Sequence, residues 1–171
     1  MAGPLSLWLV PAEEWRRRLD VLIAELAARA GTKAFAAHLT ILGRLHGGEA
    51  EALERTAELA RRMPPVPVRS PRAAHDTEYY RCVFLEVEPT PELLGAHQRA
   101  RRAFGGGPDR FRPHVSMAYG RLDEPRRDEL AHEIEQSLGL PVALEADRLE
   151  VRETGGAPSR WRLCGAFPLE A

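Results

Sequence analysis

The sequence predicts an α+β fold with two similar lobes, and three observations lead to this prediction. Predicted strands and helices alternate on both sides of the midpoint of the 171-residue chain. Two short segments nearly repeat each other, F-A-A-H-L-T at residues 35–40 and F-R-P-H-V-S at residues 111–116, with one copy in each half. A helix is predicted after each segment, so sheets would face a central cleft and helices would pack outside. We expect one domain over residues 1–171.

Proline and glycine divide the first half of the chain into strands and helices. Short apolar runs that end at proline or at polar turns predict strands. Longer segments rich in Ala, Leu, Glu and Arg carry apolar residues at helical spacing, and Gly31 ends the first of them as a C-cap would. In chain order we predict a strand over 5–10, a helix over 12–30, the first histidine strand over 36–42, a helix over 49–62, and strands over 66–74 and 80–87.

The second half follows the same rules. Pro91 stands at the start of a predicted helix, where the first turn tolerates proline. The run Gly105-Gly106-Gly107-Pro108 is a flexible breaker before the second histidine strand, and Gly139 ends the last helix. In chain order we predict a helix over 91–104, the second histidine strand over 113–119, a helix over 125–138, and strands over 142–151 and 160–167.

The composition excludes several classes of protein. The formal net charge is −1 at pH 7, so the chain lacks the strongly basic character of proteins that bind long nucleic acid. A local cluster of arginines would still bind a small anion. No apolar run approaches the roughly 20 residues that cross a bilayer, and the start of the chain lacks the positive region of a signal peptide. We therefore expect a cytoplasmic protein with no membrane partner.

The two cysteines, Cys82 and Cys164, each lie in an apolar, strand-like stretch. They would form either one disulfide or two buried free thiols, and we expect the free thiols.

The two near-repeats carry a histidine followed two residues later by a hydroxyl. Side chains alternate between the faces of a strand, so His38 and Thr40 would share one face, and His114 and Ser116 would share another. Buried structural histidines would not explain the shared hydroxyls. A zinc site needs three or four ligands, and neither segment has a second ligand nearby, nor is there an H-E-x-x-H motif. The pattern therefore favours acid–base chemistry on a phosphate.

Hydrolysis of a cyclic phosphodiester fits this set of side chains. A base must deprotonate the attacking water and an acid must protonate the departing oxygen, and histidine serves in either role near neutral pH. Hydroxyls donate to the phosphate oxygens as negative charge accumulates there. This chemistry requires no metal and no cofactor. It leaves open which histidine is the acid.

These residues carry a family resemblance. The paired H-x-T and H-x-S motifs resemble the two-histidine (2H) phosphoesterase superfamily. The segments S-L-W-L-V-P, Y-R-C-V-F-L-E-V-E-P-T-P-E-L and F-R-P-H-V-S-M-A-Y-G are similar to the cyclic phosphodiesterase-like proteins of plants and fungi. The first motif departs from the family pattern, because Ala37 stands where a proline often precedes the histidine.

The resemblance implies a bilobal fold with antiparallel sheets around a water-filled cleft. It implies hydrolysis of nucleoside 2′,3′-cyclic phosphates to 2′-phosphates, with ADP-ribose 1″,2″-cyclic phosphate as a further substrate. His38 and His114 become the acid–base pair, and Thr40 and Ser116 the phosphate donors. The family pattern also places Tyr119 near the ligand, which requires a bulge or a strand end after His114.

Several alternatives stay open. Trp8 is a candidate for stacking on the base, although a tryptophan in an apolar strand is equally typical of a core. Instead of a small cyclic nucleotide, the substrate would be an RNA end in a 2′-5′ ligase-like enzyme, or the protein would bind nucleotides without turnover. We expect a monomer. The remaining polar candidates are expected to be solvated: His46, His75, His97, His132, Arg110 and Arg112.

Overall fold

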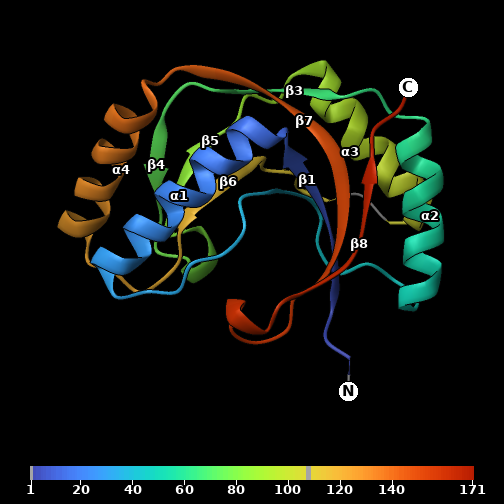
Figure 1. Ribbon diagram of the computed structural model, residues 1–171, viewed down its shortest axis with the longest axis horizontal. Helices are drawn as coiled ribbons and strands as arrows, with labels where there is room; N and C mark the ends of the chain where they lie inside the picture. Colours follow the sequence, from blue (N-terminus) through green and yellow to red (C-terminus); the bar gives the residue numbers. More distant parts are fainter. Residues whose placement is uncertain (1, 107–108) are drawn as a thin grey trace.

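The fold consists of two antiparallel sheets, each covered by two helices. The structure, a computed structural model, describes residues 2–106 and 109–171. Figure 1 shows the smaller sheet with α1 and α4 on one side of the molecule, and the larger sheet with α2 and α3 on the other. The predicted α+β class with antiparallel sheets is therefore confirmed.

The larger sheet has five strands in the order β2-β1-β7-β3, with β8 also paired to β7. Strand β7 connects most of the sheet, because its first part pairs with β3 and its second part pairs with both β1 and β8. The strands are β1 (Leu5–Pro11), β2 (Leu39–Leu42), β3 (Val66–Ser70), β7 (Val142–Glu153) and β8 (Arg162–Pro168).

The smaller sheet has three strands in the order β4-β5-β6. These strands are β4 (Ala73–His75), β5 (Val83–Glu86) and β6 (His114–Ala118). All of them come from the middle of the chain, whereas the larger sheet takes strands from both ends. The two lobes are thus unequal in size, and each histidine motif lies in a different sheet.

The four helices agree closely with the segments expected from apolar periodicity. They are α1 (Glu13–Ala30), α2 (Glu49–Arg61), α3 (Pro91–Phe104) and α4 (Glu124–Leu138). Gly31 ends α1 in the left-handed conformation, with φ 70°, as a C-cap glycine does. Helices α1 and α4 pack on the smaller sheet, and α2 and α3 on the larger one. One cluster of buried apolar side chains includes residues of both sheets and all four helices.

Several predicted boundaries were wrong, and the first histidine strand, expected over 36–42, is only β2 (Leu39–Leu42). The strand expected over 66–74 is divided between the two sheets, because Pro71 has no N–H with which to continue a ladder. The strand expected over 80–87 begins with a 3₁₀ turn, η1 (Tyr79–Arg81), and the last strand is preceded by another, η2 (Pro158–Arg160). Within the expected breaker 105–108, Gly105 caps α3 in the left-handed conformation, while residues 107 and 108 lie outside the described part of the chain.

Both cysteines are free thiols, as expected. Cys82 is buried, but Cys164 is only partly buried because it lies on β8. Among the described residues, no helix is long and apolar enough to cross a membrane.

Candidate active site

The first motif lies on the face of the larger sheet that is turned away from its helices. Along β1 the leucines enter the core, while Ser6 and Trp8 point to the opposite face and line a cavity. Thr40 on β2 pairs directly with Trp8, so both side chains project to the same face. His38 precedes β2 by one residue, and its ring stacks on Trp8 with centroids 3.5 Å apart.

Helix α1 fixes the segment that carries His38. The backbone N–H of Ala37 donates to Asp20 Oδ1 on α1 at 2.7 Å. A proline at this position, as in the family pattern, has no N–H to donate. Ala37 therefore gives this chain an anchor between the first motif and α1.

The second motif lies on β6 of the smaller sheet. Val115 and Met117 are buried in the core, and His114 and Ser116 alternate with them to reach the cavity. The ring of Phe84, on the neighbouring strand, meets His114 edge-on with centroids 5.7 Å apart.

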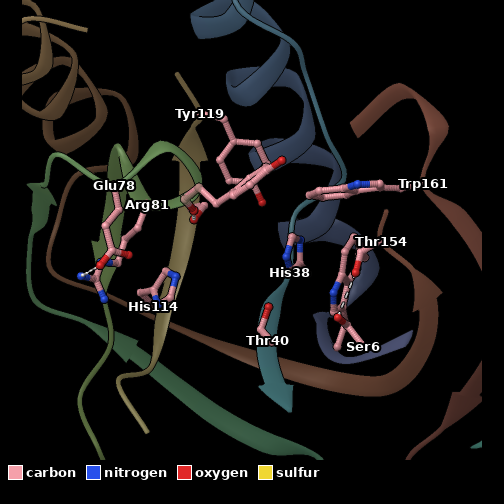
Figure 2. Close-up of a pocket in the computed structure, with 12 residues that line it drawn as sticks. Ser6, His38, Thr40, Glu78, Arg81, His114, Tyr119, Thr154 and Trp161 are labelled. Atoms are coloured by element: carbon pink, nitrogen blue, oxygen red, sulfur yellow. Dashed lines mark hydrogen bonds and ion pairs between the residues drawn. The ribbon is translucent and has the colours of Figure 1, made fainter. Parts of the chain in front are cut away.

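The two motifs face each other across one cavity of about 360 Å³. Figure 2 shows His38 and Thr40 on one side of it and His114 and Arg81 on the other. The structure thus brings together all six residues that the sequence singled out. The cavity is lined by Ser6, Trp8, His38, Thr40, Glu78, Tyr80, Arg81, His114, Ser116, Tyr119, Thr154 and Trp161.

The two imidazoles are held in the same way. His38 Nδ1 lies 2.7 Å from the carbonyl oxygen of Ala36, and His114 Nδ1 lies 2.8 Å from that of Arg112. A carbonyl oxygen only accepts, so Nδ1 carries the proton in each ring and donates it. In each neutral ring, Nε2 is therefore the nitrogen with the free lone pair. That is the tautomer that a base needs.

Burial lowers the pKa of both histidines. His38 is only 6% exposed, and desolvation brings its pKa from 6.5 to about 3, with the charges of His114 and Arg152 acting in the same direction. Desolvation also lowers the pKa of His114, assisted by the charges of Arg81 and Arg112, whereas Glu78 acts to raise it. His38 is consequently the ring held more strongly in its neutral form.

The two hydroxyls differ in their surroundings. Figure 2 shows Thr40 with its hydroxyl directed into the cavity beside His38. The Ser116 hydroxyl is buried and donates to the carbonyl oxygen of Tyr80 at 2.9 Å. The Ser116 hydroxyl therefore links the 3₁₀ turn η1 to β6, and its proton is used in this hydrogen bond.

Tyr119 reaches the cavity from just beyond the end of β6. That strand ends at Ala118, and its pairing with β5 shifts register near Val83. This strand end and irregularity place Tyr119 on the same side as the second motif. Its ring stacks on Phe35 with centroids 3.7 Å apart, and burial raises the pKa of its hydroxyl, which keeps its proton as a result.

Trp8 is 2% exposed and is covered by His38 on its stacked face. Arg152 lies over the same ring system at 4.9 Å from the centroid. The Trp8 ring thus supports His38 and leaves little surface for a base.

Sequence reasoning missed two aromatic rings at this cavity. Tyr80, from η1, is 51% exposed, and Trp161, which follows η2, lies with its ring centroid 6.1 Å from that of Tyr80. The Trp161 indole N–H donates to the carbonyl oxygen of Gly156 at 3.1 Å, which orients the ring. Both residues lie at the start of predicted strands, 80–87 and 160–167, and no local signal indicates that the two rings meet at one cavity.

Polar groups at the two ends of the cavity were also missed. Arg81 pairs with Asp76 at 2.7 Å and with Glu78 at 3.4 Å beside His114. At the opposite end, the hydroxyls of Ser6 and Thr154 lie 3.1 Å apart (Figure 2). Ser, Thr, Arg and Glu are common on surfaces, so nothing in the sequence distinguished these from other polar residues.

Comparison with known proteins identifies the family. Residues 4–158 match the profile of the 2′-5′ RNA ligase superfamily. The chain belongs to this 2H phosphoesterase superfamily. It is 26% identical over 144 residues to the cyclic phosphodiesterase of Arabidopsis thaliana, a match that covers 81% of this chain and 80% of that protein.

Solved structures show the same 2H phosphoesterase fold at low sequence identity. The protein TT0787 of Thermus thermophilus superposes with a TM-score of 0.66 at 18% identity, covering 98% of each chain. LigT of Escherichia coli in complex with NADP⁺ gives a TM-score of 0.64 at 17% identity, covering 100% of each chain.

The remaining polar candidates of this 2H phosphoesterase lie outside the cavity. Arg110 and Arg112 are exposed, and Arg112 contributes its carbonyl oxygen and its charge to His114. His46 and His132 are exposed, as expected, and His75 is partly buried. His97 differs, because it is buried. In residues 2–106 and 109–171 no group of three or more His, Cys, Asp or Glu side chains is placed to hold a metal ion.

Proposed function

We propose that this 2H phosphoesterase hydrolyses nucleoside 2′,3′-cyclic phosphates to nucleoside 2′-phosphates without a metal ion. ADP-ribose 1″,2″-cyclic phosphate is proposed as a second substrate, giving the 1″-phosphate. One observation carries the proposal: two imidazoles, each with Nδ1 fixed by a backbone carbonyl, face one cavity that also contains the Thr40 hydroxyl.

The reaction needs one proton acceptor and one proton donor. His38 Nε2 takes the proton of the attacking water as its oxygen bonds to phosphorus. The bond from phosphorus to the ribose 3′-oxygen breaks, and that oxygen receives the proton of His114 Nε2. Thr40 donates to a non-bridging oxygen, which carries more charge in the transition state than in the substrate.

The difference in environment supports His38 as the base and His114 as the acid. His38 has the more strongly buried ring and a pKa of about 3, so it is neutral at pH 7 and suited to accept a proton. His114 is less buried, and the carboxylate of Glu78 favours its protonated form. A bound anionic phosphate raises the pKa of a nearby imidazole, which supplies His114 with the proton it donates.

The size and lining of the cavity support a nucleotide as the ligand. About 360 Å³ lies at the lower end of the range for small-molecule sites. The exposed ring of Tyr80 and the oriented ring of Trp161 offer faces on which a base would stack. The naming of the Arabidopsis relative as a cyclic phosphodiesterase and the NADP⁺ complex of LigT agree with this ligand class.

The test is turnover of the four nucleoside 2′,3′-cyclic phosphates and ADP-ribose 1″,2″-cyclic phosphate in the presence of EDTA, with products resolved by phosphorus NMR. We expect a 2′-phosphate product, and a loss of about 10²–10⁴-fold in kcat for His38→Ala and for His114→Ala. His46→Ala, at an exposed loop histidine, is the matched control and should retain full activity. Because the acid must hold a proton on a ring of lowered pKa, kcat/KM should fall as the pH rises across neutrality.

Full activity of either histidine variant would exclude the two-histidine mechanism. If only an RNA with a cyclic phosphate end is turned over, the substrate is an RNA end and not a small nucleotide. Nucleotide binding with no turnover of any substrate would show a binding module.

A further inference from the structure

His97 on α3 lies outside the cavity and contacts the segments that carry the two histidine motifs. Its ring is 5% exposed and does not line the cavity. Nδ1 lies 2.9 Å from the carbonyl oxygen of Ile41, the residue after Thr40 on β2. Nε2 lies 2.8 Å from Asp109 Oδ1, five residues before His114. A single side chain therefore contacts both segments that carry the catalytic pair.

The ring has a third fixed contact. It stacks on Phe111 with centroids 4.0 Å apart and an interplanar angle of 7°. Phe111 belongs to the second near-repeat and packs against the hydrophobic core. The connection from α3 to the second motif is thus both polar and apolar.

The hydrogen-bond geometry fixes the orientation of the ring. A carbonyl oxygen faces Nδ1 and a carboxylate oxygen faces Nε2, so each ring nitrogen has a partner on a different segment. The charged groups that face it are Asp109 and, beyond that carboxylate, Arg101 of α3, whose Nε lies 3.9 Å from Asp109 Oδ1. From β2, the backbone carbonyl oxygen of Ile41 faces the ring.

We propose that His97 is a positioning residue that sets the separation of the two catalytic histidines. The proposal rests on the proposed function, since it concerns the geometry of that reaction. His97 acts through Ile41, which is bonded to Thr40, and through Asp109 and Phe111, which lead to His114. The two motifs belong to different sheets, so strand pairing within either sheet does not determine the distance between them.

A fixed separation matters because the acid and the base must act on opposite sides of one phosphorus atom. A misplacement of about 1 Å caused by a distant substitution can lower a rate by about 10²-fold. Binding depends less on this spacing, because the nucleotide can contact either wall alone. The positioning role therefore predicts an effect on kcat that exceeds the effect on KM.

The experiment compares His97→Phe, His97→Gln and Asp109→Ala with the control His132→Gln, an exposed helical histidine on α4. We expect His97→Phe to lower kcat by about 10- to 100-fold with KM changed by less than about threefold. His97→Gln retains one donor and should recover part of the loss. Asp109 is 47% exposed, so Asp109→Ala leaves the core intact and tests the contact even where His97→Phe does not fold.

Hydrogen exchange of backbone amides supplies a readout that is independent of turnover. We expect faster exchange at residues 39–42 and 114–118 together in His97→Phe and in Asp109→Ala, and no change in His132→Gln. Unchanged kcat in both the His97→Phe and Asp109→Ala variants, or unchanged exchange in both segments, overturns the positioning role. If the wild-type protein turns over no substrate, the proposed function fails, and the exchange data alone decide whether His97 links the motifs.

Discussion

The carbonyl oxygen two residues before His38 and before His114 determines which ring nitrogen is available. Ala36 and Arg112 occupy these positions, and neither side chain takes part in the hydrogen bond. The contact is local to each motif, so the near-repeat in sequence becomes a repeat in ring orientation. In each histidine, Nε2 is therefore the ring nitrogen that is left free of the backbone at the cavity.

The two hydroxyls should respond differently to removal. Thr40→Val keeps the shape of the side chain and removes a donor that faces the cavity, so we expect kcat to fall by about 10²–10³-fold with the free energy of unfolding nearly unchanged. Ser116→Ala also releases the Tyr80 carbonyl, which should lower the free energy of unfolding by about 1 kcal/mol. Steady-state kinetics and urea unfolding of both variants make the comparison. Equal kcat in wild type and Thr40→Val would remove Thr40 from the reaction.

Helix α1 positions the first motif through one contact. The N–H of the buried residue Ala37 donates to Asp20 of α1. The prediction of a strand around His38 does not indicate that a helix supplies this acceptor. The same alanine departs from the family pattern, so the loss of a proline is accompanied by a hydrogen bond that proline cannot form.

This contact can be tested by substitution at Asp20. Asp20→Ala leaves a buried N–H without an acceptor, and we expect a loss of about 1–3 kcal/mol in the free energy of unfolding, together with reduced kcat. Asp20→Asn retains a carbonyl oxygen at the same place and should restore most of both. Asp128→Ala, which removes an exposed carboxylate from α4, is the control. A stability loss in Asp20→Ala no larger than that of the control would show that the anchor is dispensable.

Helices and the two histidine motifs were predictable because their signals are local. Apolar spacing gave the bounds of α1 and α3 to within one residue, and strand alternation placed His38 with Thr40 and His114 with Ser116 at one cavity. Contacts between distant segments were not predictable. His97 has charged neighbours along its helix, which favoured a solvated side chain, yet β2 and the segment at Asp109 bury it.

At the scale of the whole molecule, a polar cavity lies between two sheets that share a core, and the buried ring of His38 lies in its wall. In the unfolded chain His38 has its usual pKa near 6.5, whereas in the folded protein the pKa is about 3. The unfolded state therefore binds more protons between these values, and stability rises with pH in that window. The contribution is fully present above pH 6.5 and is lost as the pH falls toward 3.

This linkage predicts how unfolding depends on pH. We expect the free energy of unfolding to fall between pH 6.5 and 4.5 by up to about 1.4 kcal/mol per unit from His38, with His114 adding in the same direction. Denaturant titrations of wild type, His38→Gln and His132→Gln measure the slope. The slope should become smaller only in His38→Gln. A slope that His38→Gln leaves unchanged would mean that His38 is not held neutral.

The stacking of Trp8 on His38 bears on the intrinsic tryptophan fluorescence of the protein. Of the three tryptophans in the chain, Trp8 and Trp161 both belong to the cavity wall, with their centroids 5.9 Å apart, while Trp15 lies on α1. Trp8 is in face-to-face contact with the ring of His38, and Trp161 is beside Tyr80 at the cavity. Two of the three tryptophans therefore lie in the cavity wall, and we expect ligand entry and imidazole protonation to change the intrinsic fluorescence without any added label.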